Sequence, residues 1–396
     1  MIATSRGTQQ FGILKGRTTT MPKAHRQPIA CVSLCVVAYN EAQTLPDLFE
    51  DILAQDFSRQ RLELILIDSC SVDGTGLVMQ DFARRNPGFA RIEVLKNPGR
   101  YLPQGCNIAL DNYRGDVLVR VDAHARIPAD FIRHNVECLQ RGEDVCGGLR
   151  PVILRKPSGW GRTLLAAEES AFGSSPAGYR RGLRREVSEG GEAALASPIA
   201  PASPIAPAAP AAAPPPRYVN SVFHAAYRRE VISAVGRFDE RLRRTEDNDY
   251  SSRVRRAGYR ICLDPAIRSY QYLRADLGAL LRQKGANGFW IGVSQWLSPD
   301  SVRVFHRVPA AFVLALVSTL VIAVLATGIP FLALAALYLI VVIGVSAGTV
   351  VQARQRSLTM IALPVVFAAM HICYGVATWA GLVRGAWLSA RERKDD

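Results

Sequence analysis

Several acidic side chains of this sequence follow directly after apolar runs or stand together in one polar segment. Asp68 comes after LELILI, Asp122 comes after VLVRV, and the segment TEDND begins at Thr245. Carboxylates can bind a divalent cation, and a well-placed carboxylate can accept the proton of a hydroxyl nucleophile. His124 stands two residues after Asp122 and adds an imidazole, a common metal ligand. These residues are the first candidates for a functional site.

A purely structural interpretation competes with this one. Asp68 or Asp122 alone could cap the helix that follows it, because Asp is favoured at that position. TEDND could likewise cap a helix that we expect to begin near Tyr250. One acid is enough for a cap, however, whereas TEDND carries three. We therefore favour a functional role for these acids.

The elements that would position these residues form a regular alternation. Apolar runs predict four strands, over 31–38, 62–67, 91–95 and 117–121, and amphipathic stretches predict three helices, over 45–53, 74–85 and 103–113. Nearly continuous apolar strands that alternate with helices are typical of a parallel sheet covered on both faces. No G-x-G-x-x-G follows the first strand, which disfavours a dinucleotide-binding dehydrogenase.

Ligands of open α/β sheets bind at the carboxyl ends of the strands. The segments that follow the first, second and fourth strands are Ala38-Tyr39-Asn40-Glu41, Asp68-Ser69 and Asp122-Ala123-His124. Three strand ends thus carry acidic and polar groups, and we expect them to converge on one site.

Beyond the sheet the composition changes twice. The N-terminus (1–29) is basic and polar, and we expect it to be disordered. The domain itself has a first half (30–188) and a second half (217–300). An Ala/Pro-rich flexible insert (189–216) separates the two halves. The region 301–390 is strongly apolar and predicts two to three transmembrane helices. The N-terminus has no apolar run of signal-peptide length, so the soluble part is expected to stay in the cytoplasm.

Three apolar segments, 308–327, 329–351 and 358–383, are each near or above the length needed to cross a bilayer. The connector before the third carries Arg354 and Arg356, which the positive-inside rule assigns to the cytoplasm. A spanning third segment would then place Arg384 and Arg391 outside, against that rule. It contains Pro364, and a re-entrant or interfacial segment is the alternative.

The formal net charge is +14. No Arg/Lys tract with interleaved aromatic residues is typical of a nucleic-acid platform, so we expect no nucleic-acid partner and assign the charge to lipid headgroups and nucleotide phosphates. The eight cysteines lack metal-ligand spacing and are expected to be reduced, mostly buried thiols.

Four motifs carry a resemblance to a known family: VSLCVVAYNEAQTL, LILIDSCSVDGT, VRVDAHARI and FDERLRRTEDNDYSSRVRRAG. In this order and spacing they resemble family 2 glycosyltransferases of the GT-A fold, a Rossmann-like α/β fold with a mostly parallel sheet. The DAHA form, the GRFDERLRRTEDNDY block and the short C-terminal membrane region are most similar to bacterial succinoglycan-biosynthesis glucosyltransferases of the ExoA type. The resemblance covers residues 32–290 apart from the insert, and it implies a cytoplasmic catalytic domain followed by an α-helical membrane domain.

The resemblance implies roles for single residues. The residues implied to bind the nucleotide sugar are Ala38, Tyr39, Glu41, Asp68, Asp73 and Asp122. Asp122 and His124 fill the outer positions of the family's D-x-D motif and would hold a divalent metal, Mn²⁺ or Mg²⁺, against the donor diphosphate. His124 replaces the usual last Asp, and because Mg²⁺ strongly prefers oxygen ligands, the imidazole favours Mn²⁺.

Glu246 and Asp247 resemble the family's ED motif, in which Asp247 would be the general base of an inverting displacement. On the acceptor side, Gln283 and Trp290 match a Q-x-x-R-W motif whose Arg is missing here, which puts a processive synthase in doubt. Trp290 is alternatively an interfacial anchor, as is Trp296.

The expected function is an inverting transfer of a hexose, such as glucose from UDP-glucose, at the cytoplasmic face of the inner membrane. The expected acceptor is a polyprenyl-diphosphate-linked saccharide or another exopolysaccharide precursor, and the expected partners are a UDP-sugar and the lipid bilayer. The alternatives are a processive polysaccharide synthase and a non-catalytic membrane protein that binds a nucleotide or glycan.

Overall fold

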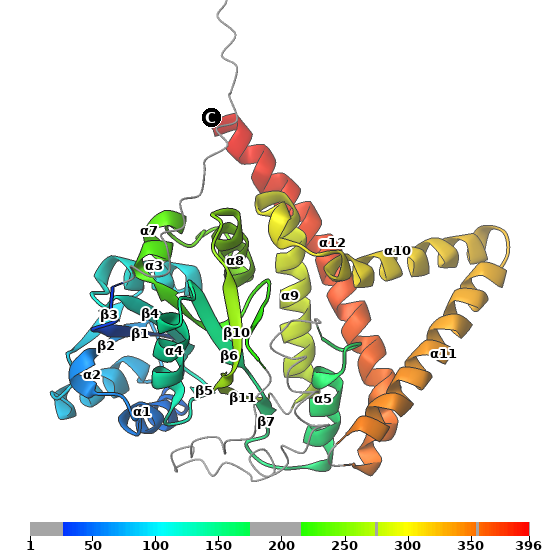
Figure 1. Cartoon of the computed structure of the whole chain (residues 1–396). Coiled ribbons are helices and arrows are strands. Elements are labelled where there is room, and N and C mark those ends of the chain that lie inside the picture. Colours follow the sequence, from blue (N-terminus) through cyan, green and yellow to red (C-terminus); the bar gives the residue numbers. More distant parts are fainter. Residues whose placement is uncertain (1–26, 175–214, 274–275, 354–355, 396) are drawn as a thin grey trace, which may run out of the picture.

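The computed structural model describes residues 27–174, 215–273, 276–353 and 356–395 (Figure 1). The expected disorder of the N-terminus and the expected flexibility of the Ala/Pro-rich insert concern residues that lie almost entirely outside these ranges.

The described chain is built on an eight-stranded sheet with the order β3-β2-β1-β4-β9-β6-β10-β8. Its strands are β1 (Val32–Ala38), β2 (Leu62–Asp68), β3 (Arg91–Lys96), β4 (Val117–Asp122), β6 (Val145–Leu149), β8 (Arg217–Tyr218), β9 (Phe223–Arg228) and β10 (Ile261–Arg268). Strands β3, β2, β1 and β4 pair in parallel, and β6 pairs in parallel with β10. This confirms the expected α/β fold with a mostly parallel sheet.

Strand β9 departs from the parallel pattern. It lies antiparallel between β4 and β6, although it follows the Ala/Pro-rich insert in the sequence. The sheet therefore takes strands from both sides of the insert. Because β9 runs in the opposite direction, its first residues lie beside the carboxyl end of β4.

Two helical layers cover the sheet. The catalytic-domain helices are α1 (Leu45–Leu53), α2 (Thr75–Arg85), α3 (Leu102–Asn112), α4 (Phe131–Gln140), α5 (Gly159–Glu169), α7 (Arg229–Val235) and α8 (Glu246–Arg256), with the short 3₁₀ turn η2 (Arg59–Arg61). Buried side chains of α1, α2 and α4 form one core cluster with the sheet, and those of α3, α7 and α8 form another. The two clusters lie on opposite faces, as the alternation of side chains along a strand requires.

A smaller sheet extends the domain toward α5. It has the order β5-β11-β7, made of β5 (Ala125–Arg126), β11 (Tyr270–Tyr272) and β7 (Val152–Ile153). β5 directly follows the carboxyl end of β4, so this small sheet extends the carboxyl edge of the large one.

The helix expected near Tyr250 begins four residues earlier, at Glu246. That expectation was wrong because the acids of TEDND occupy the first turn of the helix instead of preceding it. Negative side chains there are favoured by the positive end of the helix dipole. The last turn carries Arg253, Arg255 and Arg256, which suit its negative end.

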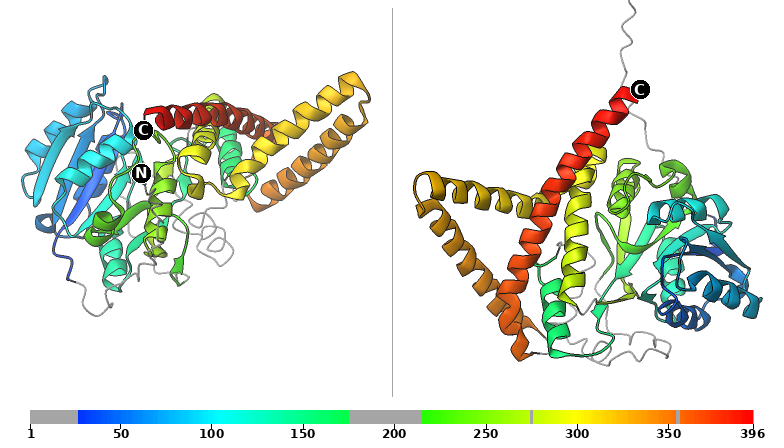
Figure 2. Two further views of the ribbon diagram at one scale, coloured as in Figure 1. Left: turned by 90° about the horizontal axis from the view of Figure 1, so that it is seen from above. Right: turned by 180° about the vertical axis from the view of Figure 1, so that it is seen from behind.

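Four helices follow the sheet domain: α9 (Leu277–Leu297), α10 (Val304–Leu325), α11 (Ile329–Gln352) and α12 (Leu363–Asp395), with the 3₁₀ turns η3 (Pro299–Ser301) and η4 (Leu358–Ala362). Three segments of the described residues, 304–325, 329–352 and 358–391, are long and apolar enough to cross a membrane. Helices α10 and α11 form a hairpin that extends away from the sheet domain (Figures 1 and 2).

Glycines bring α9 and α12 unusually close together. A Cβ atom on Gly288 or Gly292 would overlap the backbone of α12, and one on Gly381 would overlap the backbone of α9. Such contacts are typical of helices whose small residues allow backbone-to-backbone packing. The contacts of Gly288 with Tyr374 and of Gly385 with Val293 show that the two helices run in parallel.

The third apolar segment is helical without a break from Leu363. Its start packs against α5 of the sheet domain, where Thr163 and Thr359 share a hydrogen bond of 2.7 Å, and its later turns pack on α9. Helix α12 therefore lies along the sheet domain (Figure 1). It is also long and apolar enough to cross a membrane, so whether it spans or is interfacial stays a prediction.

A buried ion pair fixes the start of the small sheet against α1. Both carboxylate oxygens of Asp51 accept hydrogen bonds from Arg126, at 2.6 and 2.8 Å, and one also accepts from the backbone N–H of Ile127 at 3.0 Å. Neither side chain has any exposed surface. Two buried charges are tolerated here because each satisfies the other.

We predict that Asp51→Ala lowers the free energy of unfolding by about 3–5 kcal/mol, because it leaves the Arg126 charge buried and unpaired. The measurement is denaturant unfolding of the full-length protein in detergent, followed by intrinsic fluorescence. The control is Asp56→Ala, which breaks the exposed Arg133 pair and should cost less than about 1 kcal/mol. Equal losses for the two variants would contradict the prediction.

Candidate active site

A large cleft opens at the carboxyl edge of the sheet and continues toward the C-terminal helices. Its walls include eight of the eleven residues singled out from the sequence: Ala38, Tyr39, Glu41, Asp122, His124, Glu246, Asp247 and Gln283. They come from the ends of β1 and β4, the first turn of α8 and the second turn of α9. The convergence of strand ends that the sequence predicts is thus present at one cleft.

Arg120, which the sequence analysis did not single out, joins the two acidic segments of this cleft. One guanidinium nitrogen lies 3.3 Å from Asp122 Oδ1 and another lies 3.3 Å from Glu246 Oε1. Arg120 thus brings the end of β4 and the start of α8 together, although more than a hundred residues separate them in sequence. A signal was available, because an arginine inside the apolar strand VLVRV needs a buried acidic partner.

Asp122 is held as a carboxylate by its neighbours. Burial opposes its ionisation, but the imidazole of His224 and the guanidinium of Arg120 hold its pKa well below the usual range. The backbone N–H of Asp122 donates to Nε2 of His224 at 3.2 Å. Burial in turn lowers the pKa of His224, while the neighbouring Asp122 opposes this effect. Nothing in the sequence around His224 pointed to this contact.

His124 is held between two side chains of the cleft wall. Its Nδ1 lies 3.2 Å from Glu41 Oε1, and its Nε2 lies 2.9 Å from the side-chain nitrogen of Gln271 on β11. The residue therefore bridges the segments that follow β1 and β4 to the small sheet. Gln271 was not among the predicted residues, because no local pattern in the sequence indicates that β11 pairs with β5, next to β4.

The two acids of the ED pair have different surroundings. Glu246 is buried beside Arg120, whereas Asp247 is half-buried and faces the cleft. Burial and the neighbouring Asp247 raise the pKa of Glu246 to about 7, and the opposing effect of Arg120 is smaller. Asp247 is therefore the more exposed of the two acids in the cleft wall, and Glu246 is the more buried one, which titrates near neutrality.

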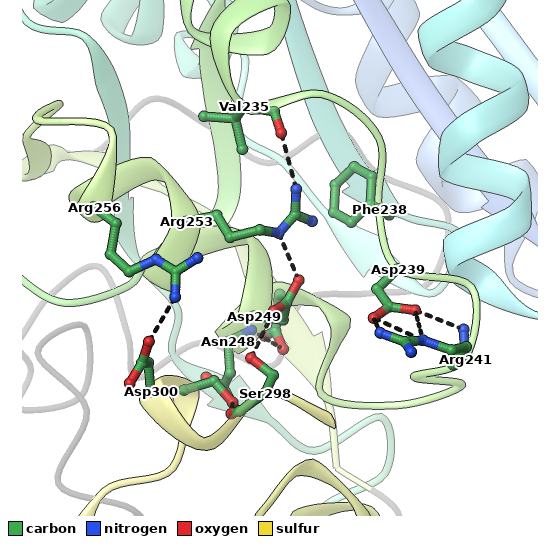
Figure 3. A network of polar contacts seen from close by, with 12 residues as sticks. Val235, Phe238, Asp239, Arg241, Asn248, Asp249, Arg253, Arg256, Ser298 and Asp300 are labelled. Atoms are coloured by element: carbon green, nitrogen blue, oxygen red, sulfur yellow. Dashed lines mark hydrogen bonds and ion pairs between the residues drawn. The ribbon is translucent and has the colours of Figure 1, made fainter. Parts of the chain in front are cut away.

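The third acid of TEDND is structural. Asp249 is buried, accepts a hydrogen bond of 2.8 Å from Arg253 one turn later, and accepts another of 2.6 Å from Ser298 at the end of α9 (Figure 3). Thr245, just before the helix, shares a hydrogen bond of 2.8 Å with Ser294 of α9. The first turn of α8 is thus attached to α9, which fixes where Asp247 points.

Strained backbone lies next to several of these side chains. Five described residues other than glycine have a positive φ: Asn40, Cys70, Arg100, His224 and Thr245. Asn40 and Cys70 follow β1 and β2, His224 touches Asp122, and Thr245 precedes Glu246. Such strain persists only where surrounding contacts enforce it, and it is concentrated at functional sites.

Asp68, Asp73 and Trp290 do not line the cleft. Asp68 is buried at the end of β2 and accepts the backbone N–H of Ser71 at 3.1 Å. Asp73 accepts from Thr75 and from the backbone N–H of Ala42, so it joins the turns after β1 and β2. The hydroxyl of Thr75 is the main reason that the pKa of Asp73 is lowered. Trp290 lies on α9 with its ring against Phe289.

The described residues contain no cluster of three or more His, Cys, Asp and Glu side chains suited to a metal ion. The cleft does hold Asp122 and His124, two residues apart in sequence, at its wall. The carboxylate of Asp122 has the charged oxygen atoms that a divalent cation needs as ligands, and His124 can supply one ring nitrogen. This pair fits a cation that completes its coordination with oxygens of a bound diphosphate.

The sequence motifs and the cleft agree with comparisons to known proteins. A family model described as Glycosyl transferase family 2 matches residues 33–195. One relative is the dolichyl N-acetyl-alpha-D-glucosaminyl phosphate 3-beta-D-2,3-diacetamido-2,3-dideoxy-beta-D-glucuronosyltransferase of Methanococcus voltae. The two chains are 21% identical over 355 residues, an alignment that covers 89% of this chain and 98% of that protein. It is 26% identical over 258 residues to the succinoglycan biosynthesis protein ExoA of Rhizobium meliloti, over 63% of this chain and 66% of that protein.

Among solved structures, the chain resembles a mannosyltransferase from Pyrobaculum calidifontis in complex with GDP-Man and Mn²⁺. The alignment covers 91% of this chain and 88% of that one, with 17% identity and a TM-score of 0.49. The family match over residues 33–195 and the named transferases among the relatives identify the class of protein: the chain is a glycosyltransferase. A non-catalytic binding protein, one of the alternatives drawn from the sequence, is thereby excluded.

We predict that Glu246 controls how the transfer rate depends on pH. Above about pH 7 an ionised Glu246 completes its ion pair with Arg120, which also holds Asp122, so kcat/KM should rise through this pH in the wild type. Glu246→Gln removes this titration and should abolish the inflection near pH 7. The measurement is sugar transfer in membranes from pH 5.5 to 8.5, with Glu240→Gln as a surface control. An inflection that persists unchanged in Glu246→Gln would refute this role.

Proposed function

We propose that this glycosyltransferase is an inverting enzyme that moves a hexose from a nucleotide sugar to a lipid-linked or exopolysaccharide-precursor acceptor. The observation that carries the proposal is the position of Asp247, which faces the cleft at the start of α8 beside the carboxyl edge of β4. A sugar hydroxyl is a weak nucleophile near neutral pH, so a carboxylate in this position can take its proton during attack. A single displacement of that kind inverts the anomeric carbon.

The donor side of the cleft suits a nucleotide sugar. Tyr39 at the end of β1 is half exposed and can stack on a base, with Ala38 beside it at the cleft wall. Arg243 packs over the ring of Tyr101 on the same side and can approach a diphosphate. UDP-glucose is the donor that we propose, on the resemblance to glucosyltransferases of succinoglycan biosynthesis.

The acceptor is proposed from the relatives and from the membrane helices together. The names of the relatives refer to a dolichyl-phosphate-linked sugar and to succinoglycan biosynthesis. The cleft continues from Asp247 to α10 and α11, so a saccharide carried on a membrane lipid can reach the base without leaving the bilayer. We therefore propose a polyprenyl-diphosphate-linked saccharide as the acceptor, with Gln283 on its side of the cleft.

We propose that the protein is a multi-pass protein of the inner membrane with its catalytic domain in the cytoplasm. The hairpin of α10 and α11 leaves the catalytic domain at η3 and returns to it at η4, so two crossings bring the chain back to the same side (Figure 2). Arg356, in the connector after α11, then lies on the cytoplasmic side, as the positive-inside rule requires.

A processive polysaccharide synthase is the alternative within the same class of enzyme. It would need enough membrane helices to form an export channel. Three helices of the described residues are long and apolar enough to cross a membrane, which is too few for a channel formed by one chain. The length of the product separates the two proposals: one added sugar supports a single transfer, and a polymer supports a synthase.

A divalent cation is part of the proposal. Asp122 and His124 would hold it, and it would neutralise the charge that develops on the leaving diphosphate. The protein supplies the surrounding geometry, because Arg120 orients Asp122 while Glu41 and Gln271 orient His124.

We predict that Asp247→Asn reduces transfer at least a hundredfold but leaves nucleotide-sugar binding nearly unchanged, because it removes only the proton acceptor; general bases typically contribute about 10²–10⁴-fold. The measurement combines mass analysis of the product in membranes with calorimetric binding of UDP-glucose to the purified protein. The matched control is the double variant Asp247→Asn/Asn248→Asp, which places an acid one residue further along the helix. Transfer should not recover in this double variant. Substantial transfer by Asp247→Asn would rule out its role as the base.

We predict that His124→Ala weakens activation by Mn²⁺ more than activation by Mg²⁺, because only Mn²⁺ gains from a nitrogen ligand. The measurement is the concentration of each metal that gives half-maximal transfer. His134→Ala, which removes a histidine of α4 that does not line the cleft, is the control. If His124→Ala and the wild type respond identically to both metals, His124 is not a ligand.

A further inference from the structure

The cleft carries more positive than negative side chains. Nine Arg and Lys residues and five carboxylates line it, so it is suited to polyanions beyond one nucleotide. Arg100 and Arg243 lie near Tyr101 on the donor side, whereas Arg255 and Arg303 lie at the opposite end, where the chain enters the first membrane helix. This second pair has no part in the donor site described above.

Arg255 differs from the arginines beside it. Arg253 is paired with Asp249, and Arg256 is paired with Asp300 at the surface (Figure 3). Within the ranges that the structure describes, no carboxylate forms an ion pair with Arg255, and its buried Nε has no hydrogen-bond partner. A partly buried guanidinium without an acid is unfavourable unless a ligand supplies the anion.

Arg303 adds a second charge to the same place. It directly precedes α10 and lines the cleft together with Arg255. Helix α8 packs against η3, and Arg256, next to Arg255, pairs with Asp300, three residues before Arg303. Burial, and then the charge of Arg303, lower the pKa of Arg255, in agreement with this arrangement. Two arginines held near one another without an acid between them form a site that a phosphate would neutralise.

The position of this pair relative to the proposed base is informative. Arg255 follows Asp247 by eight residues on the same helix, which places it about 12 Å further along α8 at 1.5 Å per residue. An acceptor whose sugar hydroxyl reaches Asp247 could therefore place its phosphate at Arg255, with a short glycan between the two groups.

Beyond the two arginines the wall of the cleft becomes apolar. It continues along α10 and α11 over Val308, Phe312, Leu334, Leu337 and Val341. These side chains are in the hairpin that we place in the membrane. The cleft thus combines carboxylates, a pair of cations and an apolar surface, which are the groups that a saccharide joined through phosphate to a hydrocarbon chain requires.

We propose that Arg255 and Arg303 bind the phosphate of an isoprenoid-phosphate-linked acceptor, whose hydrocarbon chain lies along α10 and α11. This inference rests on the proposed function and adds the place where the acceptor is held. A general role of the pair in attracting anionic phospholipids is the competing interpretation, and the position of the pair at the cleft that also holds Asp247 argues against it.

The test is the binding of radiolabelled farnesyl diphosphate to the purified full-length protein in detergent. Arg255→Gln and Arg303→Gln should each weaken binding roughly tenfold, as expected for the loss of one charge-assisted contact, and the double variant should weaken it further. Arg256→Gln is the matched control: it is the next residue on the helix, it already has Asp300 as a partner, and it does not line the cleft. It should bind as the wild type does.

Two further measurements separate the other outcomes. Phosphatidylglycerol micelles should not displace farnesyl diphosphate at equal phosphate concentration, and displacement would overturn the proposal in favour of a general anionic-lipid site. In transfer assays, the double variant should raise the KM for lipid-linked acceptor while donor hydrolysis by water stays unchanged. If the double variant binds farnesyl diphosphate as the wild type does, and the wild type still transfers sugar, this inference is wrong and the proposed function stands. If the wild type shows no sugar transfer at all, the proposed function itself is wrong.

Discussion

The arrangement of the cleft depends on one guanidinium placed between two carboxylates. Without Arg120, the charges of Asp122 and Glu246 would face each other across a partly buried space and repel. With it, the end of β4 and the start of α8 are held at one point, and Asp122 is kept ionised. Arg120 lies in β4, a central strand between β1 and β9, so its backbone is hydrogen-bonded on both sides. The positions of the donor site and of the proposed base both follow from this contact.

A second chain of contacts connects that point to the membrane helices. Helix α8 is attached to α9 through Thr245 and Asp249, and α9 packs backbone against backbone on α12. Each contact in this series is either buried and hydrogen-bonded or too close to allow a side chain between the helices. The catalytic residues are therefore oriented by the same elements that attach the domain to the bilayer, and the cleft runs directly from one to the other.

Much of this arrangement could be predicted from the sequence, and the exceptions have physical reasons. The four parallel strands and the apolar segments follow from periodicity, and the convergence of the strand ends follows from the rule that ligands bind at the carboxyl ends of strands. A shared site for Asp122 and the TEDND segment followed only from the resemblance to family 2 glycosyltransferases. The antiparallel insertion of β9 could not be predicted, because pairing between distant strands leaves no local pattern, and with it His224 was missed. The start of α8 was misplaced because acids before a helix and acids in its first turn look alike in sequence. Asp249, one of the three acids in that run, was indistinguishable from its neighbours until its burial against Ser298 was known.

The glycine-mediated contact between α9 and α12 has a geometric consequence for the reaction. Backbone contact leaves no room for a side chain between α9 and α12, so their spacing is set by the main chains alone. Helix α9 also carries Ser294, which holds Thr245 at the start of α8. In the orientation proposed above, the proposed base Asp247 and the membrane hairpin therefore belong to one packed unit, and an acceptor must span the distance between them to react.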